Sequence, residues 1–189
     1  MVCVDAQFDL GFMYSNGRVI AVDSEQAFQW YCRAAEQGHA GAQYNLGVMY
    51  IEGRGVTPDS AQAAQWHRKA AEQGLPEAQA SLGFMYCSGR GVPQDDAQAL
   101  HWYCRAAEQG HVWAQGSLGC MYVMGKCVAQ DYVEACKWFT IAMAHSSGDD
   151  QTEYAHAIEE VIKSMTSAQL AEAEARAREW VDGFESRRA

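Results

Sequence analysis

The sequence lacks the cationic charge that nucleic-acid binding requires. It has 14 Lys and Arg residues against 24 Asp and Glu residues, which gives a formal net charge of −10 and a pI near 4.9. No basic stripe is visible that would displace counterions from phosphate groups, so we expect no nucleic-acid partner. The same charge opposes adsorption to anionic membranes and favours a basic partner.

Long apolar runs are also missing. No stretch approaches the roughly 20 apolar residues of a membrane span, so we expect no membrane insertion. The start, Met1–Asp5, has neither a cationic region nor an apolar run, and no signal peptide is predicted. We therefore expect a cytoplasmic protein. Met1 is equivalent to Gln37 of the next repeat, so the sequence starts directly at a predicted helix start. If an upstream segment is missing, a secreted or periplasmic location is the alternative.

Motifs for catalysis and metal binding are absent too. The chain contains no Cys-x-x-Cys, His-Glu-x-x-His, Ser-x-x-Lys or Gly-x-Ser-x-Gly. Gly53–Val56 joins two predicted helices and is a turn, not a phosphate loop. His101 and Cys104 lie three residues apart on one predicted helix, but Arg68 occupies the position equivalent to Cys104, so a metal site is disfavoured. We expect no catalytic residue, no metal and no cofactor.

The cysteine pattern does not predict a disulfide framework. The number is odd, and only Cys32 and Cys104 occupy equivalent repeat positions, whereas a framework in a repeat protein should recur with the repeat. Reduced, mostly buried thiols are the prediction. The seven cysteines are Cys3, Cys32, Cys87, Cys104, Cys120, Cys127 and Cys136.

One block of residues occurs four times at a fixed step of 36 residues. Leu-Gly-x-Met-Tyr-x-x-Gly begins at Leu10, Leu46, Leu82 and Leu118. Self-similarity at this period indicates a solenoid of stacked units, not one globular core. The predicted repeat core is the set of leucines, tyrosines and tryptophans that keep this step: Leu10, Tyr14, Trp30, Leu46, Tyr50, Trp66, Leu82, Tyr86, Trp102, Leu118, Tyr122 and Trp138.

Each unit is predicted to be a helix, a turn and a second helix. In the unit 39–74, apolar residues at helical spacing form one stripe before Gly53, where glycine permits a left-handed helix end. The second helix begins at Asp59, and Gln62 three residues later has the spacing of a capping box. The same pair occurs as Asp23/Gln26, Asp95/Gln98 and Asp131/Glu134, and after the fourth repeat as Thr166/Gln169.

These residues resemble the Sel1-like repeat family, a branch of the tetratricopeptide-like α-solenoids. The matching signature is Ala-x-x-x-Leu-Gly-x-Met-Tyr-x-x-Gly-x-Gly-Val, then Asp-x-x-x-Ala-x-x-Trp-x-x-x-Ala-Ala-Glu-Gln-Gly, and residues 78–110 fit it nearly throughout. The resemblance covers 2–148, in repeats at about 2–37, 38–73, 74–109 and 110–148. It implies an all-α, right-handed solenoid and an adaptor that holds partner proteins in signalling complexes, in membrane-protein quality control, or at bacterial host and competitor interfaces.

Departures from the signature carry further expectations. Val19 and Cys127 replace a loop glycine, so the loops of repeats one and four should be distorted or differently hydrogen-bonded. Repeat four reads His145–Gly148 in place of Glu-Gln-Gly. Residues 151–185 are predicted to be a degenerate half-repeat, 151–164, plus a capping helix, 167–184, with a polar outer side. No cap precedes residue 2, so an uncovered first helix favours a homodimer or an upstream partner.

The resemblance implies that the first helix of each pair lines a concave face. Variable positions on these helices are more apolar than a solvated face should be, which favours a groove for an apolar or aromatic segment of a protein or peptide. Two alternatives stay open: these residues pack against the next repeat, or the C-terminal tail folds back over them. The candidate partner-binding residues are Phe8, Phe12, Tyr44, Val48, Ile51, Glu77, Phe84, Trp113, Val123 and Met124.

The function predicted from these observations is a non-enzymatic protein–protein interaction scaffold. A narrower alternative is a bacterial immunity-type protein that masks a toxin or effector enzyme. An enzyme of the β-lactam-binding kind, suggested by a disulfide-rich branch of the family, is disfavoured because neither the cysteine pair nor a nucleophile–base spacing is present. A self-assembling array joined through the first repeat is the third class.

Overall fold

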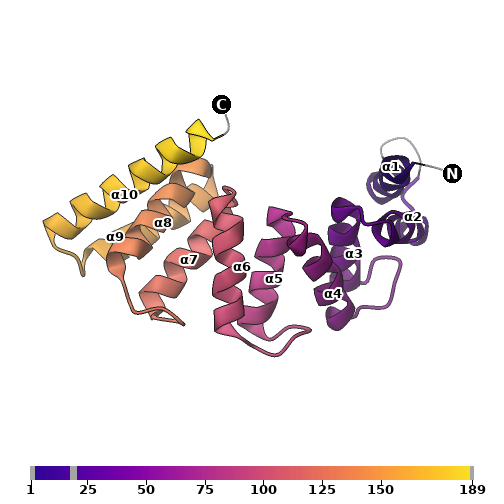
Figure 1. Cartoon of the computed structure of the whole chain (residues 1–189), viewed down its shortest axis with the longest axis horizontal. Coiled ribbons are helices and arrows are strands. Elements are labelled where there is room, and N and C mark those ends of the chain that lie inside the picture. Colours follow the sequence, from indigo (N-terminus) through magenta and orange to yellow (C-terminus); the bar gives the residue numbers. More distant parts are fainter. Residues whose placement is uncertain (1–2, 18–20, 188–189) are drawn as a thin grey trace. The chain divides into compact units, whose positions relative to one another are not determined.

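The computed structural model describes residues 3–17 and 21–187, and over these residues it contains ten α-helices and no strand (Figure 1). The chain forms two compact units, which divide after Asp95. The first unit contains α1 (Val4–Asn16), α2 (Ser24–Glu36), α3 (Ala40–Glu52), α4 (Ser60–Glu72) and α5 (Pro76–Ser88). The second contains α6 (Asp96–Glu108), α7 (Val112–Met124), α8 (Tyr132–His145), α9 (Asp149–Ile162) and α10 (Ser167–Ser186).

The first helix of every repeat ends at the glycine that the sequence pattern predicts. Gly17, Gly53, Gly89 and Gly125 all have φ between 65° and 70°. Side chains disfavour this left-handed conformation, and glycine adopts it without steric cost. The N–H of each glycine donates to the carbonyl of the methionine four residues earlier, which closes the helix.

The second helices begin with side-chain caps. One oxygen of Asp59 accepts from the N–H groups of Ala61 and Gln62 at 2.9 and 3.0 Å, and Asp131 caps α8 in the same way. At the start of α10 the capping box is reciprocal: Gln169 donates its N–H to Thr166 Oγ1, and Gln169 Oε1 accepts from the Thr166 N–H at 2.9 Å. Such a cap stabilises a helix by about 1 kcal/mol.

The loop of repeat four keeps its shape, so the predicted distortion there is wrong. Cys127 has φ 57°, close to the φ of 68° and 74° of its counterparts Gly55 and Gly91. The flanking bonds are also kept, because Lys126 N–H donates to Met121 and Asp131 N–H to Tyr122, both at 3.1 Å. The bonds around the loop hold a cysteine in a conformation that suits glycine. Val19 lies outside the described residues.

A glycine and an aromatic ring bring the two helices of a repeat together. A Cβ on Gly11 would lie 2.7 Å from the ring of Tyr31, and one on Gly119 would lie 2.5 Å from Phe139. In repeat two the ring opposite Gly47 is His67, and a Cβ on this glycine would again lie 2.7 Å from the ring. The glycine of Leu-Gly has no side chain, and the aromatic ring of the second helix therefore fills the space beside it.

His67 is buried completely in this position. Neither ring nitrogen has a hydrogen-bond partner, and loss of solvation lowers its pKa to about 4. The imidazole therefore stays neutral near pH 7 and acts as a packing ring beside Tyr44, whose ring centre lies 5.3 Å away.

A series of buried glutamines joins each repeat to the one before it. The side-chain amide of Gln43 donates to the Ala35 carbonyl at 3.1 Å, and Gln43 Oε1 accepts from Gln73 at 2.7 Å. The first bond crosses between repeats one and two and the second lies within repeat two, so together they fix the register of α3 against α2 and α4. Equivalent bonds join Gln37 to Gln7 and Gln79 to Ala71.

This series is incomplete at the end of repeat four. Gln115 donates to the Ala107 carbonyl at 3.2 Å, but its Oε1 is buried without a partner. His145 occupies the position of the donors Gln37 and Gln73. Its ring instead packs edge-on against Trp180 and Phe184 of α10. The loss of Glu-Gln-Gly in repeat four thus exchanges a hydrogen bond for packing against the last helix.

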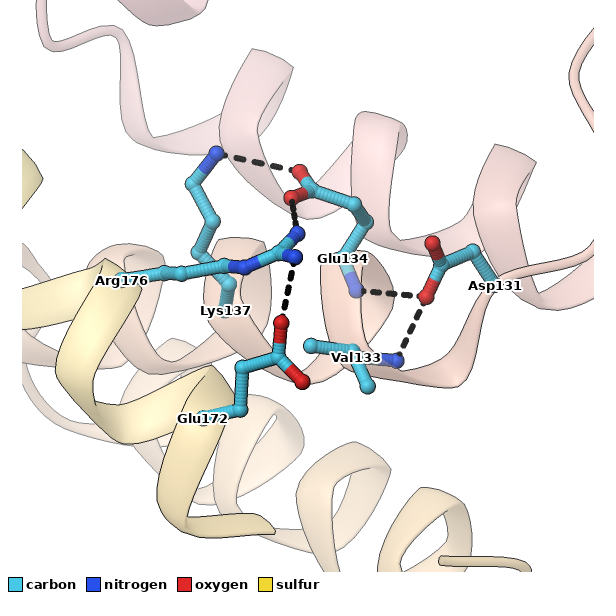
Figure 2. A network of polar contacts seen from close by, with 6 residues as sticks. All are labelled: Asp131, Val133, Glu134, Lys137, Glu172 and Arg176. Atoms are coloured by element: carbon cyan, nitrogen blue, oxygen red, sulfur yellow. Dashed lines mark hydrogen bonds and ion pairs between the residues drawn. The ribbon is translucent and has the colours of Figure 1, made fainter. Parts of the chain in front are cut away.

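The C-terminal helices complete the core of the second unit. Cys136 and Phe139 of α8, Val161 of α9 and Ala173 of α10 belong to one buried cluster. Helix α10 packs against α8, and an ion-pair network holds the two together (Figure 2). The apolar side predicted for this helix faces inward, with Ala173, Ala177 and Phe184 buried.

The predicted core is buried to different extents. Leu46, Leu82 and Leu118 are inaccessible to solvent, whereas Leu10 and the tyrosines Tyr14, Tyr50, Tyr86 and Tyr122 are half-buried. Trp102 and Trp138 are buried, and Trp30 and Trp66 half-buried. Each of these four tryptophans has a cation over its ring: Arg33 at 4.4 Å from Trp30, Lys69 at 3.9 Å from Trp66, Arg105 at 5.4 Å from Trp102 and Lys137 at 4.5 Å from Trp138.

All seven cysteines are free thiols. The prediction that they are mostly buried is wrong, because Cys136 alone is buried while Cys3, Cys120 and Cys127 are exposed. Cys3 and Cys120 occupy positions where the residue varies between repeats, and Cys127 takes the position of the loop glycine.

Candidate partner-binding site

An apolar pocket of about 280 Å³ lies between α7 and α9 in the second unit. Phe139 of α8 contributes to its lining between the two helices. Gly116 and Gly119 of α7 make the close packing there possible, because a side chain on either would collide with Tyr154 or Phe139. The pocket is lined by Cys120, Val123, Met124, Phe139, Ala157, Glu160 and Val161.

The two walls of this pocket differ in charge. Helix α7 contains no Asp, Glu, Lys or Arg, and its Trp113 and Met124 are 44% and 56% exposed. Helix α9 carries five carboxylates, among them Asp150, Glu153 and Glu160. Of these carboxylates, Glu160 lines the pocket, so an otherwise apolar pocket has one acidic residue on its α9 side.

Cys120 on the α7 wall is not an activated nucleophile. The apolar surroundings raise the pKa of its thiol, so it stays protonated at neutral pH. Burial likewise raises the pKa of the Tyr154 hydroxyl, and the nearby Asp150 adds to that effect. These groups offer an apolar and weakly polar lining, and neither is prepared for covalent catalysis.

A smaller polar pocket of about 150 Å³ lies on the first helices of the other unit. Phe12 and Arg54 line its rim, with Tyr31 buried beneath. Burial raises the pKa of Tyr31, against smaller opposing effects of hydrogen bonds from Asn45 and Ser15. Arg54 pairs with Glu52 at 2.5 Å. The pocket therefore offers hydrogen-bonding groups beside an exposed phenylalanine.

The structure separates the predicted partner-binding residues into two groups. Phe8 packs against His39 of the next repeat, with ring centres 4.3 Å apart, and Tyr44 packs against His67. For Phe8 the alternative of packing between repeats is the better description, whereas the ring of Tyr44 packs within its own repeat. Val48 and Ile51 are half-buried, and Glu77 is exposed.

The other predicted residues are open to solvent or line the pocket. Phe12 and Phe84 are 43% and 42% exposed, at equivalent positions of repeats one and three. Val123 and Met124 line the apolar pocket, and Trp113 lies on the same helix. The alternative in which the C-terminal tail covers this face is wrong for residues 167–186, because α10 packs against α8.

Sequence reasoning missed the residues of α9 that form the second wall. Ala157, Glu160 and Val161 have the spacing of one helix face, which could have identified them. The weak repeat pattern in 151–164 instead identifies Tyr154, Ala155 and Ile158, which align with the repeat signature. Across the described residues, no cluster of three His, Cys, Asp or Glu side chains could hold a metal ion. Over the same part of the chain, no helix combines the length and apolarity of a membrane span.

The family model for the Sel1 repeat matches this chain four times, at residues 4–39, 40–75, 76–111 and 114–146. The chain belongs to the Sel1 repeat family. Sel1 repeats generally form non-enzymatic scaffolds for protein–protein interaction. A comparison with curated proteins gave no match.

Solved structures of Sel1 repeat proteins share the fold. A protective antigen of uropathogenic Escherichia coli strains, which displays an SLR fold, matches with a TM-score of 0.85 and 36% identity over 96% of this chain and 38% of its own. A Sel1 repeat protein from Oxalobacter formigenes matches with a TM-score of 0.79 and 32% identity over 98% and 71%. Cysteine rich protein B of Helicobacter pylori matches at 0.52 and 27% over 61% and 88%. The chain thus spans well under half the length of the antigen.

Proposed function

We propose that this Sel1 repeat chain is a non-enzymatic scaffold that binds a partner polypeptide through the first helices of its repeats. The apolar pocket between α7 and α9 is the observation that carries the proposal. Removing one leucine-sized side chain of a partner from water contributes roughly 1.5–3 kcal/mol. Met124 at 56% exposure leaves additional apolar surface beside the pocket for such a contact.

The first unit offers further support. Phe12 and Phe84 project from the first helices of repeats one and three, and each is more than two-fifths exposed. Large exposed aromatic residues at equivalent positions are suited to bind apolar side chains of a partner. Their spacing by two repeats favours an extended contact surface over a single small-molecule site.

Photo-crosslinking from position 124 tests the proposal. A benzoylphenylalanine residue in place of Met124 should give discrete covalent adducts in cells of the source organism, and Met124→Asp should remove binding of the recovered partner. The control is the same pair of changes at Arg178, an exposed residue of α10. Adducts from position 178 alone, or a partner that binds the Met124→Asp variant unchanged, would contradict the proposed surface.

The immunity-type hypothesis is a narrower form of the same function. Under it, the recovered partner is an enzyme or toxin whose activity falls on binding. Measuring the activity of the crosslinked partner with and without this chain separates masking from neutral scaffolding. A partner that keeps full activity when saturated would rule out masking.

The exposed side of α1 supports the homodimer hypothesis. Ala6, Leu10 and Met13 are half-buried, whereas their counterparts Ala42, Leu46 and Met49 are at most 2% exposed. A second copy, or a further segment upstream, would cover the same positions that the preceding repeat covers elsewhere. Sedimentation of the wild type and Leu10→Glu tests this: a concentration-dependent dimer that the variant lacks supports it, and a monomer at every concentration rejects it.

A further inference from the structure

The pocket between α7 and α9, named the α7–α9 groove here, has two sides of different chemistry. On α7, Trp113, Cys120 and Met124 follow one another at about helical spacing and carry no charge. On α9, the corresponding row contains Asp150, Glu153, Ala157 and Glu160, which also follow helical spacing. Tyr154 lies against Gly116 of α7 and against Phe139 of α8, so α9 meets α7 closely at this one point.

Of the carboxylates of α9, Glu160 lines the groove, and the five together are only partly neutralised. Asp150 and Glu153 are exposed, and helical spacing puts them on the side of α9 that continues to Ala157 and Glu160 in the pocket lining. Lys163 bonds to Glu160 at 2.5 Å, and His156 lies 3.5 Å from Glu159. Asp150 and Glu153 make no ion pair within the part of the chain that the structure describes. Local negative charge therefore remains next to the apolar pocket.

We infer that this groove binds a basic amphipathic segment of a partner protein, with apolar side chains in the pocket and Lys or Arg side chains against Asp150 and Glu153. The inference rests on the proposed function and adds the chemistry of the partner. Opposite charges across such a surface speed association and exclude acidic competitors. The formal net charge of −10 acts in the same direction and disfavours a second copy of this chain as the occupant.

Binding of designed peptides measures this preference directly. A fluorescein-labelled peptide built from Lys-Leu-Leu-Lys blocks is the probe, with Glu-Leu-Leu-Glu and Lys-Ser-Ser-Lys peptides of equal length as comparisons. Fluorescence anisotropy should show the Lys/Leu peptide binding at least about ten-fold more tightly than either comparison. Its affinity should fall between about 0.05 M and about 0.5 M salt, because exposed charges are screened.

Two variants locate the binding. Asp150→Lys/Glu153→Lys should weaken binding of the Lys/Leu peptide about ten-fold and reduce its salt dependence, and Met124→Asp should weaken it through loss of apolar contact. The matched control is Glu36→Lys/Glu72→Lys, which makes the same change in net charge at exposed residues of the other unit. If the double lysine variant of α9 fails to fold by circular dichroism, Glu153→Gln provides the same test at smaller amplitude.

The outcomes separate this inference from the function it rests on. Equal binding of the Glu/Leu peptide, or an equal loss in the Glu36→Lys/Glu72→Lys control, would overturn the basic preference. If position 124 still crosslinks a cellular partner while the peptides show no charge preference, the inference fails and the scaffold function stands. If neither peptide nor partner contacts this groove, both are wrong.

Discussion

Arg176 and Glu134, which lie on different helices 42 residues apart, form an ion pair of 2.6 Å. Glu134 also accepts from Lys137 at 3.0 Å, and Arg176 bonds to Glu172 at 2.5 Å (Figure 2). The Glu134 and Lys137 side chains are less than one-fifth exposed. This network is the polar part of the contact that holds α10 against α8.

Arg176→Ala should loosen α10 from α8. The change leaves Glu134 with Lys137 as its remaining ion partner, and the effect should shrink at high salt because Arg176 is partly exposed. Hydrogen exchange should show faster exchange of amides in α10, with little change in α2 to α4. Arg178→Ala, on an exposed position of the same helix, is the control. Equal effects of the two variants would show that the ion pair does not hold the helix.

Gln43→Ala should lower the free energy of unfolding by roughly 0.5–1.5 kcal/mol for each of the two hydrogen bonds it removes, to the Ala35 carbonyl and from the Gln73 amide. Gln115→Ala should cost less, since Gln115 Oε1 has no partner to lose. Urea denaturation followed by circular dichroism compares the two. A larger loss at position 115 would contradict the assignment of the bonds.

The stability of the first unit should fall as the pH drops from about 6.5 to about 4. His67 has a pKa of about 4 in the folded chain, below its ordinary value of 6.5, so the unfolded chain binds the proton more readily in this window. Its contribution is fully present above pH 6.5 and is lost toward pH 4, for a total of about 3 kcal/mol. His67→Tyr places the residue of repeats one and three there and should flatten this part of the stability profile. Identical slopes for both proteins would count against a buried neutral histidine.

Gly119→Ala should destabilise the second unit by roughly 1–3 kcal/mol, because the new Cβ would lie 2.5 Å from Phe139. The control is Gly183→Ala in α10, where the nearest atom is a flexible arginine nitrogen at 3.6 Å. That change should stabilise the helix by roughly 0.5–1 kcal/mol. Thermal unfolding should therefore shift in opposite directions, and a shift in the same direction would disprove the role of the close contact.

Local features of the fold were predictable from the sequence because they depend on neighbours in the chain. The left-handed glycine at position 53 and the cap at Asp59 each require only the residues of one turn. The 36-residue repeat also predicted that the units stack, because a two-helix unit cannot bury its apolar side alone. The glutamines of the series also recur every 36 residues, but nothing in the sequence indicates that these polar side chains are buried.

The site was less predictable because exposure depends on contacts between repeats. Phe8 and Phe12 are both apolar residues of one helix, yet Phe8 packs on His39 while Phe12 stays exposed. Spacing alone does not distinguish a ring directed toward the next repeat from one directed into solvent. The floor of the pocket comes from Phe139, which the sequence placed in the core, and its second wall comes from a helix with a weak repeat signal.

The contacts that define a repeat join positions at constant offsets along the chain, as in Gly11 with Tyr31 and Gly47 with His67. Gene duplication or deletion of a 36-residue segment would therefore return every such residue to an equivalent neighbour. The array can change length in evolution without inventing a new interface, and the surface available for recognition grows or shrinks with it.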